Sequence, residues 1–281
     1  MKSSRTNIVI KIGTSALLTS RHTLNIRRIA ELIRQVDALK QQNVTVTIIT
    51  SGAVACGRQR LGRKKETTEG VRERQLYAAV GQVELMLKYQ TEAQKRHLIV
   101  AQVLATKQDF NTRQHFANMQ RCFSVLHAQG VIPIVNENDV VAVEELMFTD
   151  NDQLAGLIAS MVNADALIIL SDIAGLFDRP LDEKGARLLK TYHPSKDRGR
   201  IRIGRTSSYG RGGMQSKLET ARLLSEQGIA THIADASAPD ILLRIQKGEC
   251  VGTTVVPIRT HVSGTRCCLA RSADYFFPLV S

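Results

Sequence analysis

Hydrophobic positions along the chain follow two periods, which alternate from one end to the other. Short apolar runs rich in β-branched residues are typical of buried strands, and they lie at residues 8–12, 44–50, 98–104, 131–135, 166–170, 229–234 and 253–256. Between them, apolar residues recur at helical spacing, at residues 25–41, 54–61, 75–89, 112–129, from 152 onward, 214–227 and 239–246. This alternation is typical of βαβ units and predicts an α/β protein with a mostly parallel sheet.

Three segments depart from the regular pattern. Residues 62–74 and 182–211 are polar and charged, so we expect exposed loops there, and residues 140–149 predict a hairpin or an irregular flap. In the helix expected at residues 75–89, the pair Gly81-Gln82 interrupts the pattern and indicates close packing. One face of this helix carries Leu76, Ala79, Val83 and Leu87.

Two clusters of acids and amides stand at the ends of these elements. Residues 136–139 (NEND) follow the strand at 131–135, and residues 149–153 (TDNDQ) lead into the next helix. A turn accounts for the Asn and Asp residues of the first cluster, and a helix N-cap accounts for either Asp150 or Asp152 in the second. One turn and one cap require fewer polar groups than are present. Because ligands of α/β proteins bind at the carboxyl ends of strands, we interpret both clusters as candidate binding positions.

Two lysines stand next to glycine turns. Lys11 interrupts the apolar strand at 8–12, where a buried ammonium group is costly unless it is paired; the alternative is an edge strand. The segment Gly13–Ser15 behind it suits the close approach of a phosphate. Lys217 follows Gly210–Gly213 within one helical turn, so it can point back toward an anion at that turn; the alternative is a solvated lysine. Neither turn is a P-loop or a dinucleotide fingerprint.

Composition and charge narrow the function classes. The 281 residues are 43% apolar and 23% charged, which is typical of a globular protein, and no run approaches the about 18 apolar residues of a membrane span. The N-terminal segment shows no secretory signal and the five cysteines show no paired spacing, which favours the cytoplasm. The net charge of +12 suits binding to nucleic acid, an anionic membrane or small anionic substrates. An aromatic content of 4% without tryptophan argues against nucleic acid, since base stacking needs aromatic side chains.

The remaining motifs favour phosphoryl transfer. The sequence contains no HExxH, Cys-His or GxSxG arrangement, so zinc hydrolysis and a serine nucleophile have no support. Phosphoryl transfer needs positioning and cations around the moving group rather than covalent participation by the protein. Lys11 and Lys217 can supply those cations, with Asp152 holding both ammonium groups in place.

Eight blocks between Asn7 and Pro257 carry a family resemblance. They read IVIKIGTSALL, TSGAVACGRQRLG, AAVGQ, IPIVNENDVVA, TDNDQLAGLIA, LIILSDIAGLF, GRGGMQSKLETA and VGTTV. In this order they resemble the glutamate 5-kinases of the amino acid kinase superfamily, and equally the kinase half of plant-type pyrroline-5-carboxylate synthases. The resemblance implies a three-layer αβα sandwich with a mostly parallel central sheet, formed by a kinase domain at residues 1–258. It also implies a homo-oligomer, either a dimer or a tetramer, and a short tail at 259–281 in place of an RNA-modification-type C-terminal domain.

The same resemblance implies a reaction and a set of site residues. The γ-carboxylate of L-glutamate would attack the γ-phosphate of ATP in the first step of proline biosynthesis, with Mg²⁺ carried mainly on the ATP phosphates and no metal ligands from the protein. Catalysis is assigned to Lys11, Lys217 and Asp152. Glutamate binding is assigned to Ser51, Gly52, Ala53, Asn136, Asp139 and Asn151. Nucleotide binding is assigned to Lys11, Ser171, Asp172, Gly210, Arg211, Gly212, Gly213, Met214 and Lys217.

Two positions depart from the family pattern, and two alternatives stay open. The segment 177–180 reads FDRP where the family often has Tyr-Thr-x-Asp-Pro, and Arg211 stands where many bacterial members have Thr. One alternative is another amino acid kinase with a different acceptor. The other is a non-catalytic, basic protein that binds anions or nucleic acid, which the net charge and the basic run Lys196–Arg211 would suit. The trio of Lys11, Asp152 and Lys217 argues against the second, because binding alone does not need it.

Overall fold

One central sheet organises the structure. The computed structural model describes residues 5–63, 70–141, 148, 150–197, 199–201 and 213–258. Within these residues, the sheet has eight strands in the order β3-β4-β2-β1-β5-β7-β8-β6. Neighbouring strands are parallel, except for the antiparallel pair β7 and β8. The strands are β1 (Asn7–Ile12), β2 (Thr45–Ile49), β3 (Val100–Ala105), β4 (Ile132–Glu137), β5 (Ala166–Ser171), β6 (Thr191–Tyr192), β7 (Ala230–Asp235) and β8 (Thr253–Val255).

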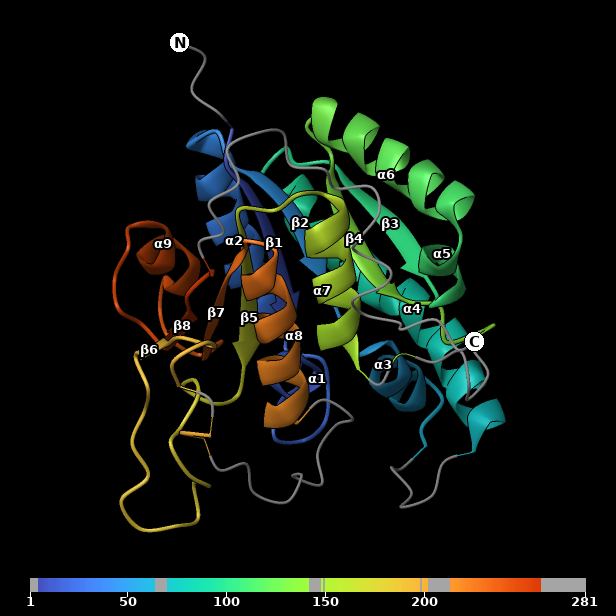
Figure 1. Cartoon of the computed structure of the whole chain (residues 1–281). Helices are drawn as coiled ribbons and strands as arrows, with labels where there is room; N and C mark the ends of the chain where they lie inside the picture. The colour runs from blue at the N-terminus through green and yellow to red at the C-terminus, as the bar shows by residue number, and fades with distance from the viewer. Residues whose placement is uncertain are drawn as a thin grey trace.

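Helices cover both faces of this sheet (Figure 1). Successive strand residues point to opposite faces, so Ile8 and Ile10 pack in one core with α2, α4 and α9, and Val9 packs in another with α6, α7 and α8. The predicted three-layer αβα sandwich is therefore confirmed. The helices are α1 (Thr14–Leu17), α2 (Ile26–Gln41), α3 (Ala53–Arg60), α4 (Val71–Gln94), α5 (Gln108–Asn111), α6 (Arg113–Ala128), α7 (Asn151–Met161), α8 (Met214–Glu226) and α9 (Ile241–Gln246).

Strand β1 lies at the centre of the sheet. It pairs with β2 on one side and with β5 on the other, both in parallel register. The alternative of an edge strand for Lys11 is therefore wrong. The chain places β2, β3 and β4 on one side of β1 before it adds β5 on the other. Such a reversal of strand order opens a crevice at the carboxyl ends of the strands, where α/β proteins bind ligands.

Several boundaries differ from the sequence-based expectation. Strand β4 continues past the apolar run, because Asn136 and Glu137 still pair with β3; these two residues belong to a strand and not to a turn. The hydrophobic pattern does not predict α1, α5 or β6, since elements of four, four and two residues are too short to show a period. No helix in the described part of the chain is long and apolar enough to cross a bilayer.

Helix α4 differs most from its prediction. It begins at Val71, inside the segment expected to be an exposed loop. The apolar face predicted for it points to solvent, and Leu76, Val83 and Leu87 are 53%, 70% and 50% exposed. The face that packs against the protein carries smaller and more polar residues instead, namely Ala78, Gly81, Gln82, Leu85, Tyr89, Glu92 and Ala93.

Helices α3 and α4 cross with their backbones in contact. A β-carbon added to Gly81 would lie 1.8 Å from the carbonyl oxygen of Ala53, and one added to Gly57 would lie 1.8 Å from that of Tyr77. Only glycine fits at either position, which confirms the close packing predicted for Gly81-Gln82. The pair does not interrupt α4, which runs through it without a break.

Parts of some predicted features lie outside the described residues. They are residues 64–69 of the loop expected at 62–74, residues 142–147 and 149 of the expected flap, residues 198 and 202–211 of the basic segment, and the expected tail at 259–281.

Candidate active site

The carboxyl ends of four parallel strands meet at one edge of the sheet. Strands β1, β2, β4 and β5 run in the same direction, so the segments that follow them leave from the same edge, beside α1 and α3 (Figure 1). Lys11, Ser51, Asn136 and Ser171 stand at or just beyond these four strand ends. The fold thus brings together residues from four distant parts of the sequence.

Asp152 lies between two lysines. Nζ of Lys11 is 2.6 Å from Oδ1 of Asp152, and Nζ of Lys217 is 2.9 Å from Oδ2. The three residues are almost completely buried, with exposed fractions of 0% for Asp152, 5% for Lys11 and 6% for Lys217. Lys11 comes from β1, Asp152 from the first turn of α7 and Lys217 from the first turn of α8. The structure therefore has the contact that the sequence analysis expects, one ammonium group on each carboxylate oxygen.

The lysine cluster (Lys11, Asp152 and Lys217) places one carboxylate between two ammonium groups. Burial raises the pKa of Asp152, but the attraction of Lys11 and Lys217 outweighs burial and holds that pKa below its ordinary value. Asp152 is therefore ionised at neutral pH. Two lysine side chains directed at one position suit the approach of an anion such as a phosphate group.

Helix α7 begins with a cap that fixes Asp152. Oδ1 of Asp150 accepts hydrogen bonds from the backbone N–H groups of Asp152 and Gln153, at 2.7 and 3.1 Å. Of the two capping candidates in the sequence, Asp150 is thus the N-cap and Asp152 is the residue that holds the lysines. Oδ2 of Asp150 is buried and meets no hydrogen-bond partner in the ranges that the structure describes.

An amide network adjoins the lysine cluster. Nδ2 of Asn151 lies 2.6 Å from the carbonyl oxygen of Thr50, 2.8 Å from Oγ of Ser51 and 2.9 Å from Oδ1 of Asn136. Nδ2 of Asn136 in turn donates to Oε1 of Gln82, at 3.0 Å. Within the described part of the chain, Nε2 of Gln82 is buried and has no hydrogen-bond partner. Ser51, Asn136 and Asn151 are all predicted to bind glutamate, and they are therefore joined directly. Gln82 connects this network to α4.

Gly52 and Ala53 form the start of α3 next to this network. Gly52 is the N-cap residue and has a left-handed backbone with φ of 99°, a conformation that glycine adopts without steric cost. Ala53 is the first helical residue and is buried. Three residues further along α3, burial raises the pKa of the Cys56 thiol to about 11. This cysteine is therefore not a nucleophile at neutral pH.

Asp139, another residue predicted to bind glutamate, forms an ion pair with Arg74. Nη2 of Arg74 lies 2.8 Å from Oδ1 of Asp139. Arg74 belongs to α4, whereas Asp139 follows β4, so the ion pair joins a helix to a loop at the strand-end edge. Nε of Arg74 is buried and has no hydrogen-bond partner among the residues that the structure describes.

The predicted nucleotide residues divide into two groups. Ser171 ends β5 and is buried, whereas Asp172 is exposed and accepts a hydrogen bond from Oγ of Ser171 at 3.1 Å. Gly213 is the N-cap of α8 and Met214 is its first residue, one turn before Lys217. Gly210, Arg211 and Gly212 lie outside the described residues. The start of α8 is therefore joined to the lysine cluster through Lys217.

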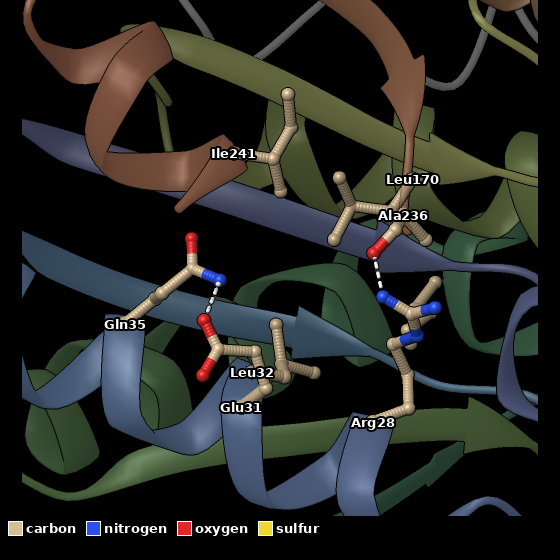
Figure 2. A pocket seen from close by; sticks show the side chains of 8 residues that line it. Arg28, Glu31, Leu32, Gln35, Leu170, Ala236 and Ile241 are labelled. Atoms are coloured by element: carbon tan, nitrogen blue, oxygen red, sulfur yellow. Dashed lines mark hydrogen bonds between the residues drawn. The ribbon is translucent and has the colours of Figure 1, made fainter. Parts of the chain in front are cut away.

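A small cavity elsewhere is too small to be a substrate site (Figure 2). It lies between α2 and α9, has a volume of about 10 Å³ and is lined by residues that include Leu32 and Ile241. That volume holds about one water molecule. Arg28 donates to the carbonyl oxygen of Ala236 at its edge, and Nε2 of Gln35 donates to Glu31 at 2.8 Å.

Sequence reasoning assigns no chemical role to two residues of the site. Arg74 stands at the end of a segment expected to be a loop, and Gln82 is interpreted only as a mark of close packing. A signal for both is present in the sequence. Arg74 and Gln82 are eight residues apart, two helical steps of four, which places them on one face of a helix.

Comparisons with known proteins agree with this geometry. The model of the "Amino acid kinase family" matches residues 7–235. A glutamate 5-kinase from Bacteroides thetaiotaomicron is 39% identical over 277 residues, 98% of this chain and 77% of that protein. A glutamate 5-kinase from Chlorobaculum tepidum is 43% identical over 261 residues, 92% of this chain and 71% of that protein. The solved structure of a UMP kinase from Bacillus anthracis shares the fold, with a TM-score of 0.60 and 16% identity over 90% of this chain and 96% of that one.

The fold and the family define a class, an α/β phosphotransferase, and in this chain two buried lysines share one aspartate beside an amide network. More narrowly, the chain belongs to the amino acid kinase family, in the group of the glutamate 5-kinases.

Proposed function

We propose that the chain transfers the γ-phosphate of ATP to the γ-carboxylate of L-glutamate and forms L-glutamyl 5-phosphate, the first step of proline biosynthesis. The observation that carries the proposal is the junction between Asn151 and Asp152. These two consecutive residues belong to the amide network and to the lysine cluster, respectively. An acceptor held by Asn151 would therefore lie beside the position where a phosphate would meet Lys11 and Lys217.

In this proposal the lysine cluster acts on the moving phosphoryl group. A carboxylate is already a nucleophile at neutral pH, so the reaction needs no general base. The remaining requirement is to stabilise negative charge on the phosphoryl oxygens in the transition state. Lys11 and Lys217 would supply that stabilisation, and Asp152 would hold both ammonium groups in place before the nucleotide arrives.

The acceptor and the nucleotide would occupy opposite sides of this cluster. Ser51, Asn136 and Asn151 would position glutamate beside the backbone of Gly52 and Ala53, and Asp139 would bind its ammonium group. The nucleotide would lie along the end of β5 and the start of α8, with contacts assigned to Ser171, Asp172, Gly210, Arg211, Gly212, Gly213, Met214 and Lys217.

Mg²⁺ would enter with the nucleotide. It keeps several water ligands and is usually bound through substrate phosphates with one or two carboxylates. Each carboxylate oxygen of Asp152 already contacts a lysine, so the proposal assigns the metal to the ATP phosphates rather than to Asp152. The metal would neutralise phosphate charge and orient the γ-phosphate toward the acceptor.

We also propose that the protein works in the cytoplasm as a homo-oligomer. The exposed stripe of α4, formed by the apolar residues Leu76, Val83 and Leu87, supports self-association. Clustered large apolar side chains on a surface often mark an interface. Two further large apolar residues, Ile99 before β3 and Val125 of α6, are 65% and 62% exposed. Strand β3 is also an edge strand of the sheet, and both α4 and β3 lie on the same side of the molecule (Figure 1).

One assay tests the proposed reaction. The protein is incubated with MgATP, hydroxylamine and one acceptor in turn, namely L-glutamate, L-aspartate or N-acetyl-L-glutamate, and UMP is tested through ADP release. Hydroxylamine traps an acyl phosphate as a coloured hydroxamate. We expect hydroxamate from glutamate alone.

The other outcomes would identify the alternatives. Hydroxamate from aspartate or acetylglutamate, or ADP release with UMP, would assign a different acceptor. The absence of turnover with every acceptor, together with nucleic-acid binding that weakens steeply with salt, would replace the kinase by a binding protein.

A further inference from the structure

Arg74 lies where a cation is unfavourable without a partner. It belongs to the first turn of α4, and the positive end of the helix dipole disfavours a positive charge there. Its side chain instead reaches Asp139, which is 65 residues away in the sequence and 2.8 Å away in space. The two side chains are only 22% and 8% exposed. Arg74 therefore neutralises the carboxylate that we assign to the ammonium group of the substrate.

Arg74 also has a donor that nothing in the described structure uses. A guanidinium group presents five N–H donors in a planar fork. Asp139 accepts from Nη2, but Nε is buried and has no hydrogen-bond partner. A buried donor without an acceptor destabilises the structure, so an incoming oxygen atom would be bound favourably there. Nε and Nη2 together form the edge of guanidinium that matches the two oxygens of a carboxylate.

The face of α4 that carries Arg74 determines how a substrate would be oriented in the proposed acceptor site. Arg74, Ala78 and Gln82 are four residues apart, so they lie on one face, and eight residues of helix rise about 12 Å. Gln82 contacts Asn136, which contacts Asn151 beside the lysine cluster. Arg74 and Asp139 therefore mark the end of the acceptor site that lies away from the cluster. A substrate whose reacting carboxylate lies beside Asn151 would direct its α-carbon toward Arg74.

We infer that Arg74 is a specificity-determining residue that binds the carboxylate on the α-carbon of the acceptor, an inference that rests on the proposed function. The ammonium group of the substrate takes the place of Arg74 on Asp139, and the guanidinium group turns its Nε–Nη2 edge to the α-carboxylate. Arg74 and Asp139 thus match the two charges of an amino acid, and they neutralise each other when no substrate is bound. A dicarboxylate without an ammonium group would leave Asp139 paired with Arg74.

A substrate that lacks only the α-carboxylate isolates this contact. 4-Aminobutyrate has the chain, the reacting carboxylate and the ammonium group of glutamate, but no carboxylate on the carbon that bears nitrogen. Binding of L-glutamate and 4-aminobutyrate is measured by calorimetry without ATP, and kcat and KM for glutamate are measured by ADP release. The proteins are the wild type, Arg74→Met, Arg74→Lys and the control Arg72→Met, which removes an exposed cation from the same helical turn.

We expect Arg74→Met to weaken glutamate binding by about 30-fold or more, as for the loss of a charge-assisted bidentate contact, with the change in KM rather than in kcat. Binding of 4-aminobutyrate should not weaken, because Arg74 would not contact this ligand and would no longer compete with its ammonium group for Asp139. Arg74→Lys keeps the positive charge but not the planar guanidinium group, so its affinity for glutamate should lie between those of the wild type and Arg74→Met. The control Arg72→Met should bind both ligands as the wild type does.

Two results would overturn the inference. One is glutamate binding by Arg74→Met that equals the wild type, whatever happens with 4-aminobutyrate. The other is an equal loss for both ligands, which would indicate a structural role in which Arg74 only ties α4 to the loop after β4. If Arg74→Met does not fold, the same comparison is made with Arg74→Lys. Failure of the proposed function would be separate, because the wild type would then form no hydroxamate from glutamate.

Discussion

The candidate site has two ends, the lysine cluster and the amide network. They meet at the peptide bond between Asn151 and Asp152, but they are built differently. At the phosphoryl end, each oxygen of Asp152 holds one lysine, so the side chains are already in place. At the proposed acceptor end, Nε of Arg74 and Nε2 of Gln82 are buried donors without partners among the described residues. The contacts of the first end are made within the chain, whereas the second end presents donors to an incoming ligand. In the proposed function, the first end is therefore preorganised and the second would be completed by its substrate.

This difference predicts that substitutions at the two ends have different kinetic effects. A preorganised group that acts on charge formed in the transition state contributes to kcat. A group whose hydrogen bonds are made with the ground-state substrate contributes mainly to KM. Substitutions at each end test whether the effects on kcat and on KM separate in this way.

The largest loss of activity is expected for Lys217→Ala. Removing one of two cations at the transferred phosphoryl group should lower kcat by about 100-fold or more, with a smaller change in the KM for glutamate. Steady-state ADP release with varied glutamate measures both values. The control Lys247→Ala removes an exposed lysine after α9 and should keep wild-type rates. A Lys217→Ala enzyme with near-normal kcat would remove Lys217 from the mechanism.

Asp152→Asn should cause the largest loss of stability. It leaves two buried ammonium groups without their counter-charge, and breaking a buried ion pair in this way costs about 3–5 kcal/mol. Denaturant unfolding measures the free energy of unfolding, and the exposed Asp182→Asn serves as the control. A loss below about 1 kcal/mol would show that the lysines shed their charge or find other partners.

The same pair of proteins predicts a pH dependence. The pKa of Asp152 is lower in the folded state than its ordinary value of 3.8, so its ion pairs add stability above that value. This stability is lost as the pH falls from about 4 through the folded-state pKa. Wild-type stability should therefore approach that of Asp152→Asn in acid, as measured by thermal unfolding between pH 7 and pH 3. A difference that stays constant over this range would contradict the assignment of charge.

At the acceptor end, Asp139→Ala should act on binding. Loss of a charged hydrogen bond to the substrate ammonium group should raise the KM for glutamate about 10- to 100-fold, while kcat at saturating glutamate changes less than about threefold. The exposed Asp182→Ala is again the control, measured in the same ADP-release assay. An unchanged KM would count against Asp139 as the ammonium site.

The smallest effect on activity is expected far from both ends. Val83→Glu places a charge within the exposed stripe of α4, so it should shift an oligomer toward monomer by at least about tenfold in the dissociation constant while kcat changes less than about twofold. Light scattering after size-exclusion chromatography measures the mass. Lys88→Glu adds a carboxylate on another side of the same helix as the control. A Val83→Glu protein that keeps the wild-type mass would assign the stripe no role in assembly.

The sequence predicts the layers of the fold well and the site unevenly. The strands follow from short β-branched runs, and the Lys11–Asp152–Lys217 contact follows because each residue is chemically conspicuous where it stands. Residues of α4 are different, since Arg74 and Gln82 become functional only through contacts with Asp139 and Asn136 that are far away in sequence. Hydrophobic periodicity also selects the wrong face of α4, because that helix crosses α3 through glycine and leaves its large apolar residues exposed.

The glycine contact between α3 and α4 has a mechanical consequence. The Ser51–Ala53 turn is built into one helix and the pair Arg74 and Gln82 into the other, and at Gly57 and Gly81 no side chain separates the two backbones. In the proposed function, the distance between the two walls of the acceptor site is therefore set by bare main chain. A single methyl group at Gly57 would act as a wedge between α3 and α4, although it would meet Tyr77 and Gly81, which are assigned no contact with the substrate.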